Sequence, residues 1–433
     1  MSRVRVIGGG LAGCEAAWQL AQRGVEVDLY EQKGVRRHPA FQSDDLAELI
    51  CSNSLRSDNP ENAVGLLKNE LRELGSLIMA AADQHRVPAG SSLAVDRVGF
   101  SREITEKILS HPLITLHRQE VTELDLTVPT ILACGPLLEG ALAEKLAELI
   151  HQDSLYFYDA VAPIVTRESV DFSSAYYKSR YDDENPGDYI NCPLSREEFF
   201  AFYEALVSAK TIAVRNMDKE IYFEGCMPIE AMARRGMKTM LFGPLKPVGL
   251  EQDGKRPYAV VQLRRDDALD TLYNLVGFQT HLTFPEQKRV FSMIPALKNA
   301  EFVRYGVMHR NTYMNSPHVL NDHYGFRDYP LLYAAGQLTG VEGYIESTAS
   351  GCYAALSLYQ QLQGKEIRTL SRGTMIGAMA SYISNPATTK LVPMNANFGI
   401  FQDPADVPAK EKKHLRIERA LQEVRDYRDE LAV

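Results

Sequence analysis

The stretch of residues 4–13 constrains the fold of this chain more than any other. An apolar run over residues 4–7 predicts a buried strand, and the pattern Gly8-x-Gly10-x-x-Gly13 follows it without a break. The first glycine permits a tight turn, the second lets a pyrophosphate approach the backbone, and the third lets a helix pack against the strand. The pattern therefore predicts a turn that holds phosphate groups.

The residues after this turn complete a strand–turn–helix–strand unit. Residues 15–21 are typical of a helix, and an apolar strand over residues 25–30 ends on the acid Glu31. Phosphates would lie at the N-terminus of the helix, where free N–H groups and the helix dipole favour negative charge. Glu31 would accept hydrogen bonds from a ribose. The unit predicts a dinucleotide site, whose phosphate-binding residues are Gly8, Gly9, Gly10, Leu11, Ala12 and Gly13.

A second strand, glycine-rich turn and small-residue helix occurs near the other end of the chain. Residues 331–335 predict the strand, and residues 347–355 predict the helix. Two such units at opposite ends of a chain resemble the glutathione-reductase-like flavin fold, in which the second helix points its N-terminus at the flavin ring. The pair favours FAD over NAD as the tightly held cofactor. The expected contacts are Gly336, Gly340, Gly343 and, at the end of a third apolar strand over residues 130–134, Gly135.

Length and composition limit the class of protein. The chain has 433 residues, enough for two or three domains, and its contents of 45% hydrophobic and 24% charged residues are ordinary for a globular protein. No apolar run is long enough to span a bilayer, and the first strand begins too early to leave room for a signal peptide. We therefore expect a cytoplasmic protein without a membrane contact. The net charge of −9 does not favour nucleic acid.

Six cysteines are scattered along the chain without a Cys-x-x-Cys pair. This spacing argues against structural zinc and against a disulfide framework, and we predict no metal site, but it leaves reactive thiols open. Cys51 ends an apolar approach and precedes small polar residues, a setting in which the residues alone favour a buried thiol over a reactive one. Cys226 lies between Gly225 and Met227-Pro228, which predicts a bend.

The local composition of the sequence changes near residue 156, after which aromatic and charged residues are frequent. We expect an inserted α+β domain over residues 156–295. The remaining segments, residues 1–155 and 296–433, would form a discontinuous FAD-binding domain of the Rossmann type. The predicted fold class is therefore α/β, with a glutathione-reductase-like core and one insertion.

Four further segments carry expectations of secondary structure. Residues 61–85 predict one helix, residues 121–124 a short strand and residues 302–313 one longer strand. Residues 408–431 predict a charged C-terminal helix whose basic side chains fall on neighbouring turns. These side chains suit either a phosphate contact or a plain solvated face.

Several motifs, taken together and in their order along the chain, indicate one protein family. The segments Cys51-Ser52-Asn53-Ser54-Leu55-Arg56 and Glu224-Gly225-Cys226-Met227-Pro228-Ile229-Glu230 occur with the first glycine turn and with residues 304–313 and 340–344. In this order they resemble the TrmFO family, the bacterial folate- and FAD-dependent tRNA (uracil-5-)-methyltransferases. The resemblance covers essentially the whole chain. A more distant likeness is to the large FAD subunit of the enzymes that modify the wobble uridine of tRNA.

The resemblance implies a reaction and its reactants. The substrate would be the uridine in the T-arm of tRNA, with the carbon coming from 5,10-methylenetetrahydrofolate and the electrons from FAD reduced by NADPH or NADH. Cys226 is then the candidate nucleophile and Cys51 the candidate base, although the sequence leaves the reverse assignment open. No stable protein partner is implied.

The same resemblance suggests which residues contact flavin or folate. His309, Arg310 and Asn311 form a polar cluster on a predicted strand, and such strand ends face the cofactor crevice in open α/β sheets. Arg97 and Tyr344 are weaker candidates of the same kind. Three alternatives stay open: the same chemistry on a ribosomal RNA uridine, a plain FAD-dependent dehydrogenase, and a flavin-bound RNA-binding protein without catalysis.

Overall fold

A computed structural model gives the arrangement of the chain in space. It describes residues 3–38, 40–151, 155–180, 187–212, 222, 227–252, 254–403 and 409–431. None of the helices in these ranges is both long and apolar enough to cross a membrane.

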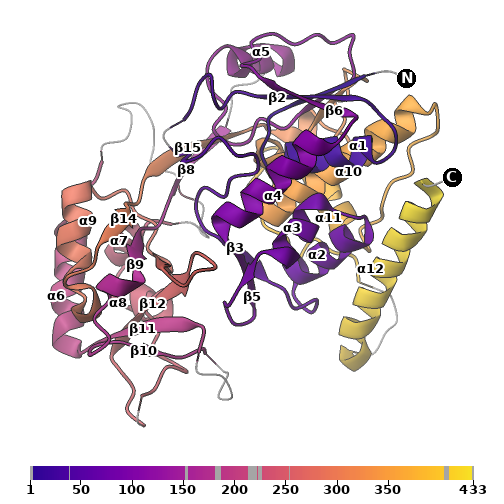
Figure 1. Cartoon of the computed structure of the whole chain (residues 1–433). Helices are drawn as coiled ribbons and strands as arrows, with labels where there is room; N and C mark the ends of the chain where they lie inside the picture. Colours follow the sequence, from indigo (N-terminus) through magenta and orange to yellow (C-terminus); the bar gives the residue numbers. More distant parts are fainter. Residues whose placement is uncertain are drawn as a thin grey trace.

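A five-stranded parallel sheet forms the centre of the larger half of the molecule (Figure 1). Its central strand β1 pairs with β2 on one side and β7 on the other, so that Val6 lies between Leu29 and Ile131. Nearly every residue of β1 is buried, as expected for a parallel strand covered on both faces. The order is β16 (Leu332–Ala334), β7 (Thr130–Leu132), β1 (Val4–Ile7), β2 (Val27–Glu31) and β6 (Ile114–Arg118).

Two helices from opposite ends of the chain pack tightly together beside this sheet. They are α1 (Leu11–Ala21), which follows β1, and α10 (Tyr344–Leu362), which follows β16. A methyl group on Gly351 would lie 2.2 Å from the carbonyl oxygen of Ala12, so only glycine permits this crossing. Because each helix follows a strand of the sheet, both begin near the carboxyl ends of the central strands. The predicted α/β class and its two strand–turn–helix units are confirmed.

An antiparallel six-stranded sheet forms the second half, to the lower left in Figure 1. The described residues of this half include the helices α6 (Arg196–Ser208), α7 (Ile229–Arg234), α8 (Met237–Phe242) and α9 (Phe284–Phe291). The sheet order is β10 (Tyr176–Tyr177), β11 (Tyr189–Leu194), β12 (Ala259–Arg265), β13 (Leu272–Leu275), β9 (Ile164–Thr166) and β14 (Phe302–Arg304). The domain boundaries at residues 156 and 296 stay a prediction.

The chain enters and leaves this second half through one antiparallel ladder. Strand β8 (Leu155–Ala160) pairs with β15 (Met308–Tyr313), and Asp159 lies directly opposite His309. The ladder thereby joins two segments that are about 150 residues apart in the sequence. It is the structural reason that the functional residues described below meet.

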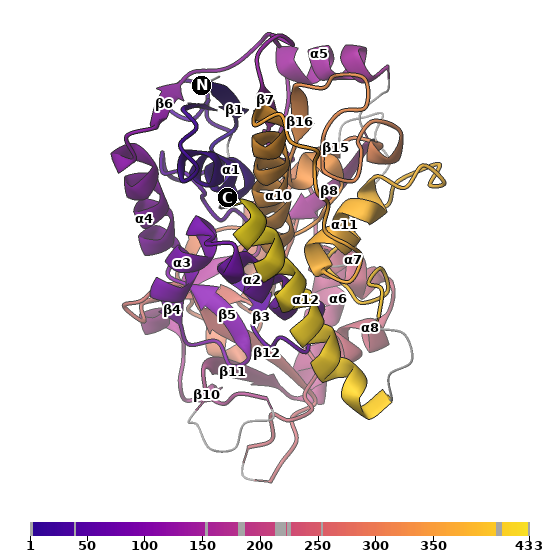
Figure 2. The same cartoon turned by 90° about the vertical axis from the view of Figure 1, so that its right-hand side faces the viewer.

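The remaining elements surround the parallel sheet and its two helices, and α12 packs against α2 (Figures 1 and 2). A small sheet has the order β3 (Ser54–Ser57), β5 (Ser92–Val95), β4 (Arg86–Val87). The helices are α2 (Ala63–Glu73), α3 (Leu77–Gln84), α4 (Arg97–Ser110), α5 (Ala141–Ile150), α11 (Met375–Ile383) and α12 (Ala409–Leu431). Short 3-10 helices occur at Arg167–Ser169, Pro295–Leu297, Ser316–His318 and Gly336–Thr339.

Three expectations of secondary structure are wrong. The predicted helix over residues 61–85 is two helices, because Gly75 takes a left-handed conformation with φ of 70° and Ser76 caps α3. Residues 121–124 form no strand, since they lie beyond the last residue of β6. The segment 302–313 contains two strands, β14 and β15, which belong to different sheets.

Several basic side chains of the C-terminal helix α12 form ion pairs with acidic side chains of the same molecule. Lys412 and Arg416 both pair with Asp403, and Lys413 pairs with Glu61. The guanidinium of Arg416 also lies 3.9 Å from the ring centre of Phe398. These contacts favour a packed and solvated helix over a phosphate contact.

Glu70 gives the fold a pH dependence that can be measured. Burial raises its pKa from 4.5 to about 8, although its carboxylate accepts hydrogen bonds from the N–H groups of Met375 and Ile376 at the start of α11. Between pH 4.5 and 8 the unfolded chain loses a proton that the folded chain keeps. The free energy of unfolding should therefore fall as the pH rises through this window, by up to about 1.4 kcal/mol per pH unit. Urea unfolding at several pH values measures how the free energy of unfolding depends on pH. This dependence should be weaker in Glu70→Gln than in the wild type, and unchanged in the exposed Glu366→Gln. The same pH dependence in all three proteins would contradict this assignment.

Candidate functional site

A cavity opens at the carboxyl ends of β1, β7 and β16, where the two glycine turns face each other. Its empty space is about 1140 Å³, part of it open to solvent. Its walls include Gly8, Gly9, Gly10, Leu11, Ala12, Glu31, Lys33, Glu48, Gly135, Gly336 and Tyr344.

The first glycine turn has the shape of a phosphate cradle. A methyl group on Gly8 would lie 2.2 Å from the carbonyl oxygen of Ala133, and one on Gly13 would lie 1.8 Å from that of Gly8. A methyl group on Gly10, by contrast, would meet no atom within 4 Å. No side chain caps α1, so its first N–H groups are left for a ligand. The turn is thus closed on its protein side and open on its cavity side.

Glu31 ties the end of β2 to this turn. One of its carboxylate oxygens accepts a hydrogen bond from the N–H of Gly9 and the other from the N–H of Lys33, each at 2.8 Å. The side chain is buried and lines the cavity. Glu31 therefore lies where an adenosine ribose would be expected, and its contact with ribose stays a prediction.

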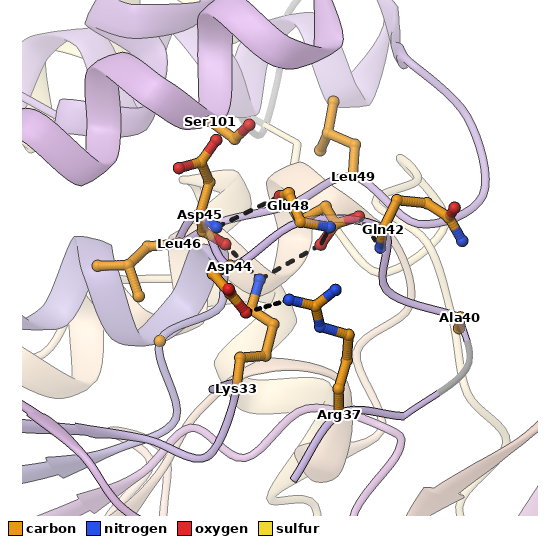
Figure 3. A network of polar contacts seen from close by, with 12 residues as sticks. Lys33, Arg37, Ala40, Gln42, Asp44, Asp45, Leu46, Glu48, Leu49 and Ser101 are labelled. Atoms are coloured by element: carbon orange, nitrogen blue, oxygen red, sulfur yellow. Dashed lines mark hydrogen bonds and ion pairs between the residues drawn. The ribbon is translucent and has the colours of Figure 1, made fainter. Parts of the chain in front are cut away.

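A buried ion pair holds the loop that follows Glu31 (Figure 3). The ammonium of Lys33 lies 3.3 Å from a carboxylate oxygen of Glu48 and donates to the carbonyl of Asp45. Glu48 also accepts from the N–H of Gln42 at 2.6 Å, and the Lys33 ammonium lies 4.7 Å from the ring centre of Phe41. This pair could not be foreseen from the sequence, since a lysine and a glutamate 15 positions apart are ordinary in any loop.

Breaking this pair should destabilise the cavity wall. The side chains of Lys33 and Glu48 are only 2% and 6% exposed, so Lys33→Met leaves a buried carboxylate without its partner. We expect Lys33→Met to lower the free energy of unfolding by about 3 kcal/mol and to weaken flavin retention. The double variant Lys33→Met/Glu48→Gln should recover part of the loss. Thermal denaturation and the flavin content after gel filtration measure both effects, and a double variant no better than the single one would contradict the pairing.

The second glycine turn brings Tyr344 to the cysteine segment. Gly336, Gly340 and Gly343 have φ values of 77°, 88° and 117°, which side-chain-bearing residues rarely adopt. The turn ends at Tyr344, whose hydroxyl accepts hydrogen bonds from the N–H groups of Cys51 at 2.9 Å and Ser52 at 3.2 Å. Cys51 therefore lies next to the N-terminus of α10, at the predicted flavin end of the cavity.

Cys51, Asp159 and His309 form a compact cluster. The Cys51 sulfur lies 3.6 Å from Asp159 Oδ2 and 3.9 Å from His309 Nε2, and these two atoms are themselves 3.6 Å apart. Burial, followed by the charge of Asp159, raises the pKa of Cys51 well above its usual value. The thiol is therefore protonated near neutral pH in this arrangement, with a carboxylate and an imidazole as its nearest proton acceptors. Three such atoms also suit a metal ion, and the absence of a metal stays a prediction.

The predicted cluster His309, Arg310 and Asn311 is divided between two sides of β15. Asn311 points the same way as His309 and donates to Asp159 Oδ2 at 3.5 Å, whereas the Arg310 guanidinium lies 4.1 Å from the ring centre of Tyr156. This division follows from the alternation of side chains along a strand. His309 Nδ1 and Asn311 Oδ1 are buried without a hydrogen-bond partner, so the cluster has polar atoms left for a ligand.

Arg97 supports the cysteine segment. Its guanidinium donates to the carbonyls of Leu49 and Ile50 and forms two hydrogen bonds with Asp266, at 2.8 and 3.1 Å. Arg97 thus lies behind Cys51, in a role that the sequence did not suggest. Its predicted contact with a cofactor stays a prediction.

Cys226 lies outside the described residues, and its role as the nucleophile stays a prediction. The other thiols are packed: Cys14, Cys192 and Cys352 are buried, and burial raises the pKa of each. Burial also raises the pKa of Cys134, which lines the cavity, to about 12.

The residues present fit FAD. The cavity joins a turn that suits a pyrophosphate, an acid that suits a ribose and the uncapped N-terminus of a second helix, α10. This second N-terminus would stabilise negative charge on a reduced flavin. The open space at Gly10 is the observation that fits a bound phosphate most directly.

Comparison with known proteins agrees with this geometry. The family model described as glucose inhibited division protein A matches residues 3–366. A Listeria monocytogenes protein named methylenetetrahydrofolate–tRNA-(uracil-5-)-methyltransferase TrmFO is 54% identical over 432 residues, which cover 99% of each chain. A Bacillus licheniformis protein of the same name is 55% identical over 428 residues, covering 98% of each chain. The solved structure of Aquifex aeolicus GidA has a TM-score of 0.72 at 15% identity and covers 99% of this chain and 73% of that one, a likeness that concerns the fold alone.

Proposed function

We propose that this chain, which belongs to the TrmFO family and matches the glucose inhibited division protein A model, methylates C5 of a uridine in tRNA. The proposed uridine is in the T-arm, and the carbon donor is 5,10-methylenetetrahydrofolate. FAD reduced by NADPH or NADH provides the electrons, and the reaction takes place in the cytoplasm. The observation that supports this most is the position of Cys51, whose thiol contacts Asp159 and whose N–H donates to the hydroxyl of Tyr344, a residue that lines the cavity that fits FAD.

The reaction needs a covalent step because C5 of uracil is a poor nucleophile. A thiolate that adds to C6 turns C5 into an enolate-like carbon, which then attacks the methylene carbon of the folate. Loss of the C5 proton and cleavage of the bond between the methylene carbon and the folate nitrogen release tetrahydrofolate and leave an exocyclic methylene group at C5, while the sulfur stays bonded to C6. The thiolate departs and restores the 5,6 double bond once that group has been reduced. That group is two electrons short of methyl. When bound in its reduced form, FAD supplies the hydride that completes it.

We assign the addition to Cys226 and the removal of the C5 proton to Cys51. The surroundings of Cys51 support a proton-transfer role, because its thiol can give a proton to Asp159 and so become a base for the C5 proton. His309 lies within 3.6 Å of the same carboxylate oxygen and can share that proton. The reverse assignment of the two cysteines differs in one observable, which is the cysteine that is bonded to C6.

An assay on two RNAs tests the proposal. The flavin-loaded protein is given NADPH, methylenetetrahydrofolate and either a T-arm mini-helix without modification or a ribosomal RNA fragment, and 5-methyluridine is measured by mass spectrometry. Methylation of the mini-helix, dependent on folate, supports the proposal. Methylation of the ribosomal fragment alone would move the same chemistry to that RNA. No methylation of either RNA, together with substrate turnover that survives Cys226→Ala, would favour a plain dehydrogenase.

A further inference from the structure

The segment that carries Cys51, residues 49–53, has no helix or strand of its own, yet its polar groups are held from several sides. The Arg97 guanidinium donates to the carbonyls of Leu49 and Ile50, and the Tyr344 hydroxyl accepts from the N–H groups of Cys51 and Ser52. These contacts fix the backbone immediately before and after the thiol. They come from α4 and α10, which both cover the parallel sheet.

A further set of contacts comes from the other half of the molecule. Arg264, on β12 of the six-stranded sheet, donates to the Ser52 hydroxyl at 2.6 Å and to the Asn53 side-chain oxygen at 3.1 Å. The Asn53 amide donates in turn to the carbonyls of Val95 and Arg265, each at 2.9 Å. The segment beside Cys51 is therefore bonded directly to β12.

The same strand end also orients Arg97. Asp266, which follows β12, binds the Arg97 guanidinium with both carboxylate oxygens, while Arg97 reaches the carbonyls before Cys51. Arg264, Asn53 and Asp266 are 8%, 0% and 4% exposed, so water cannot readily replace a lost partner. Residues 264–266 thus bind the cysteine segment directly after the thiol, at Ser52 and Asn53, and through Arg97 before the thiol.

We propose that Arg264 and Asp266 are positioning residues, through which the six-stranded sheet sets the place of the Cys51 thiol. The proposal rests on the proposed function only in giving Cys51 a part in the reaction. It goes beyond that function, because it makes the geometry of the thiol depend on a sheet that supplies none of the cavity walls named above. A shift of β12 relative to the parallel sheet would move residues 49–53 and, with them, the thiol relative to Asp159.

Arginine suits this position because its guanidinium reaches two acceptors with a fixed angle between the donors. A lysine keeps the positive charge but cannot reproduce the forked contact with Ser52 and Asn53. Arg264→Lys should therefore loosen the segment without removing the charge. The neighbouring residue Arg265 provides a matched control, since its side chain alternates to the other face of β12 and pairs with Asp270 at 3.0 Å.

The test uses the full-length, flavin-loaded protein and measures the alkylation rate of Cys51 by iodoacetamide at several pH values, with peptide mapping. In Arg264→Lys and Asp266→Asn we expect alkylation at neutral pH to be at least about fivefold faster, because the thiol is less buried and further from Asp159. The pH midpoint of alkylation should fall toward that of an ordinary thiol. The kcat for RNA should drop about tenfold with KM for RNA and flavin content unchanged. Arg265→Lys should match the wild type in every readout.

The outcomes separate the two proposals. Alkylation of Cys51 in Arg264→Lys that equals the rate in Arg265→Lys would overturn the positioning role, whatever the activity. Altered alkylation in a protein that methylates no RNA would uphold the positioning role and overturn the proposed function. Should Arg264→Lys fail to retain flavin, Ser52→Ala removes one acceptor of the fork without a change of charge, and the same two alkylation results decide.

Discussion

Replacing Gly10 by alanine is expected to abolish tight flavin binding while the fold stays intact. Gly10 has a φ of −78°, which any residue adopts, and an added methyl group would meet no protein atom within 4 Å. The methyl group would instead occupy the space in which a pyrophosphate approaches the backbone. We expect flavin affinity to fall at least about a hundredfold, which corresponds to about 2.7 kcal/mol. Flavin fluorescence titration of the apoprotein measures this loss.

The neighbouring glycines should behave differently, and this difference is the control. A methyl group on Gly13 would lie 1.8 Å from the Gly8 carbonyl oxygen, so Gly13→Ala forces backbone apart and should lower the free energy of unfolding by about 3 kcal/mol. A methyl group on the half-buried Gly373, in the turn before α11, would lie 3.0 Å from the Ser371 hydroxyl oxygen, a side-chain atom that can shift, so Gly373→Ala should leave flavin binding unchanged. Flavin binding by Gly10→Ala equal to that of the wild type would refute the phosphate cradle.

Loss of either cysteine proposed as catalytic, Cys51 or Cys226, is expected to reduce methyl transfer about a thousandfold or more, because in the proposed mechanism both act on the same uracil ring in sequence. The two variants should differ in what they trap. Fluorine at C5 cannot leave as a proton does, so RNA that carries 5-fluorouridine should stay bonded to the nucleophile. The bonded complex is expected in Cys51→Ala and absent in Cys226→Ala.

Serine and packed-thiol variants control this experiment. Cys51→Ser keeps a hydroxyl in contact with Asp159 but has a much weaker acid, so it should be as inactive as Cys51→Ala while retaining flavin. Cys352→Ala, at a buried thiol on α10, should keep its activity per bound flavin. A bonded complex that is lost in Cys51→Ala and kept in Cys226→Ala would exchange the two assigned roles. Full activity in both variants would remove the cysteines from the reaction.

The cofactor end of the site could be predicted because backbone geometry dictates its residue types. Gly8, Gly336, Gly340 and Gly343 all have positive φ, and glycine is the residue that adopts such angles without strain. Glu31 could be placed for a similar reason, since it ends the strand that pairs with β1. Such backbone requirements involve only a few consecutive residues, so they can be recognised in a single sequence.

The thiol end could be predicted only in part. Asp159 was missed, because only the β8–β15 register sets it opposite His309, and register is a tertiary property. The hydrogen bonds of Arg264 to the cysteine segment, and of Asp266 to Arg97, were missed for the same reason. Buried charges such as Lys33 and Glu48 resemble surface charges in a sequence, and only their burial distinguishes them.

The misassigned elements have local causes. The helix expected over residues 61–85 has an apolar period that continues across Gly75, and the left-handed conformation at that glycine outweighs the period. Residues 302–313 read as one strand because both β14 and β15 are strands, while the three residues between them carry the chain from one sheet to another. Periodicity identifies the type of an element more securely than its length.

The central claim is that a carbon from folate becomes the C5 methyl group of a tRNA uridine with the help of a reduced flavin. Its most direct test supplies methylenetetrahydrofolate with both methylene hydrogens replaced by deuterium, together with the flavin-loaded protein, NADPH and the T-arm mini-helix. We predict 5-methyluridine whose methyl group carries two deuterium atoms and one hydrogen, since the third comes from the reductant. A methyl group without deuterium, or no methyl group at all, would contradict the account.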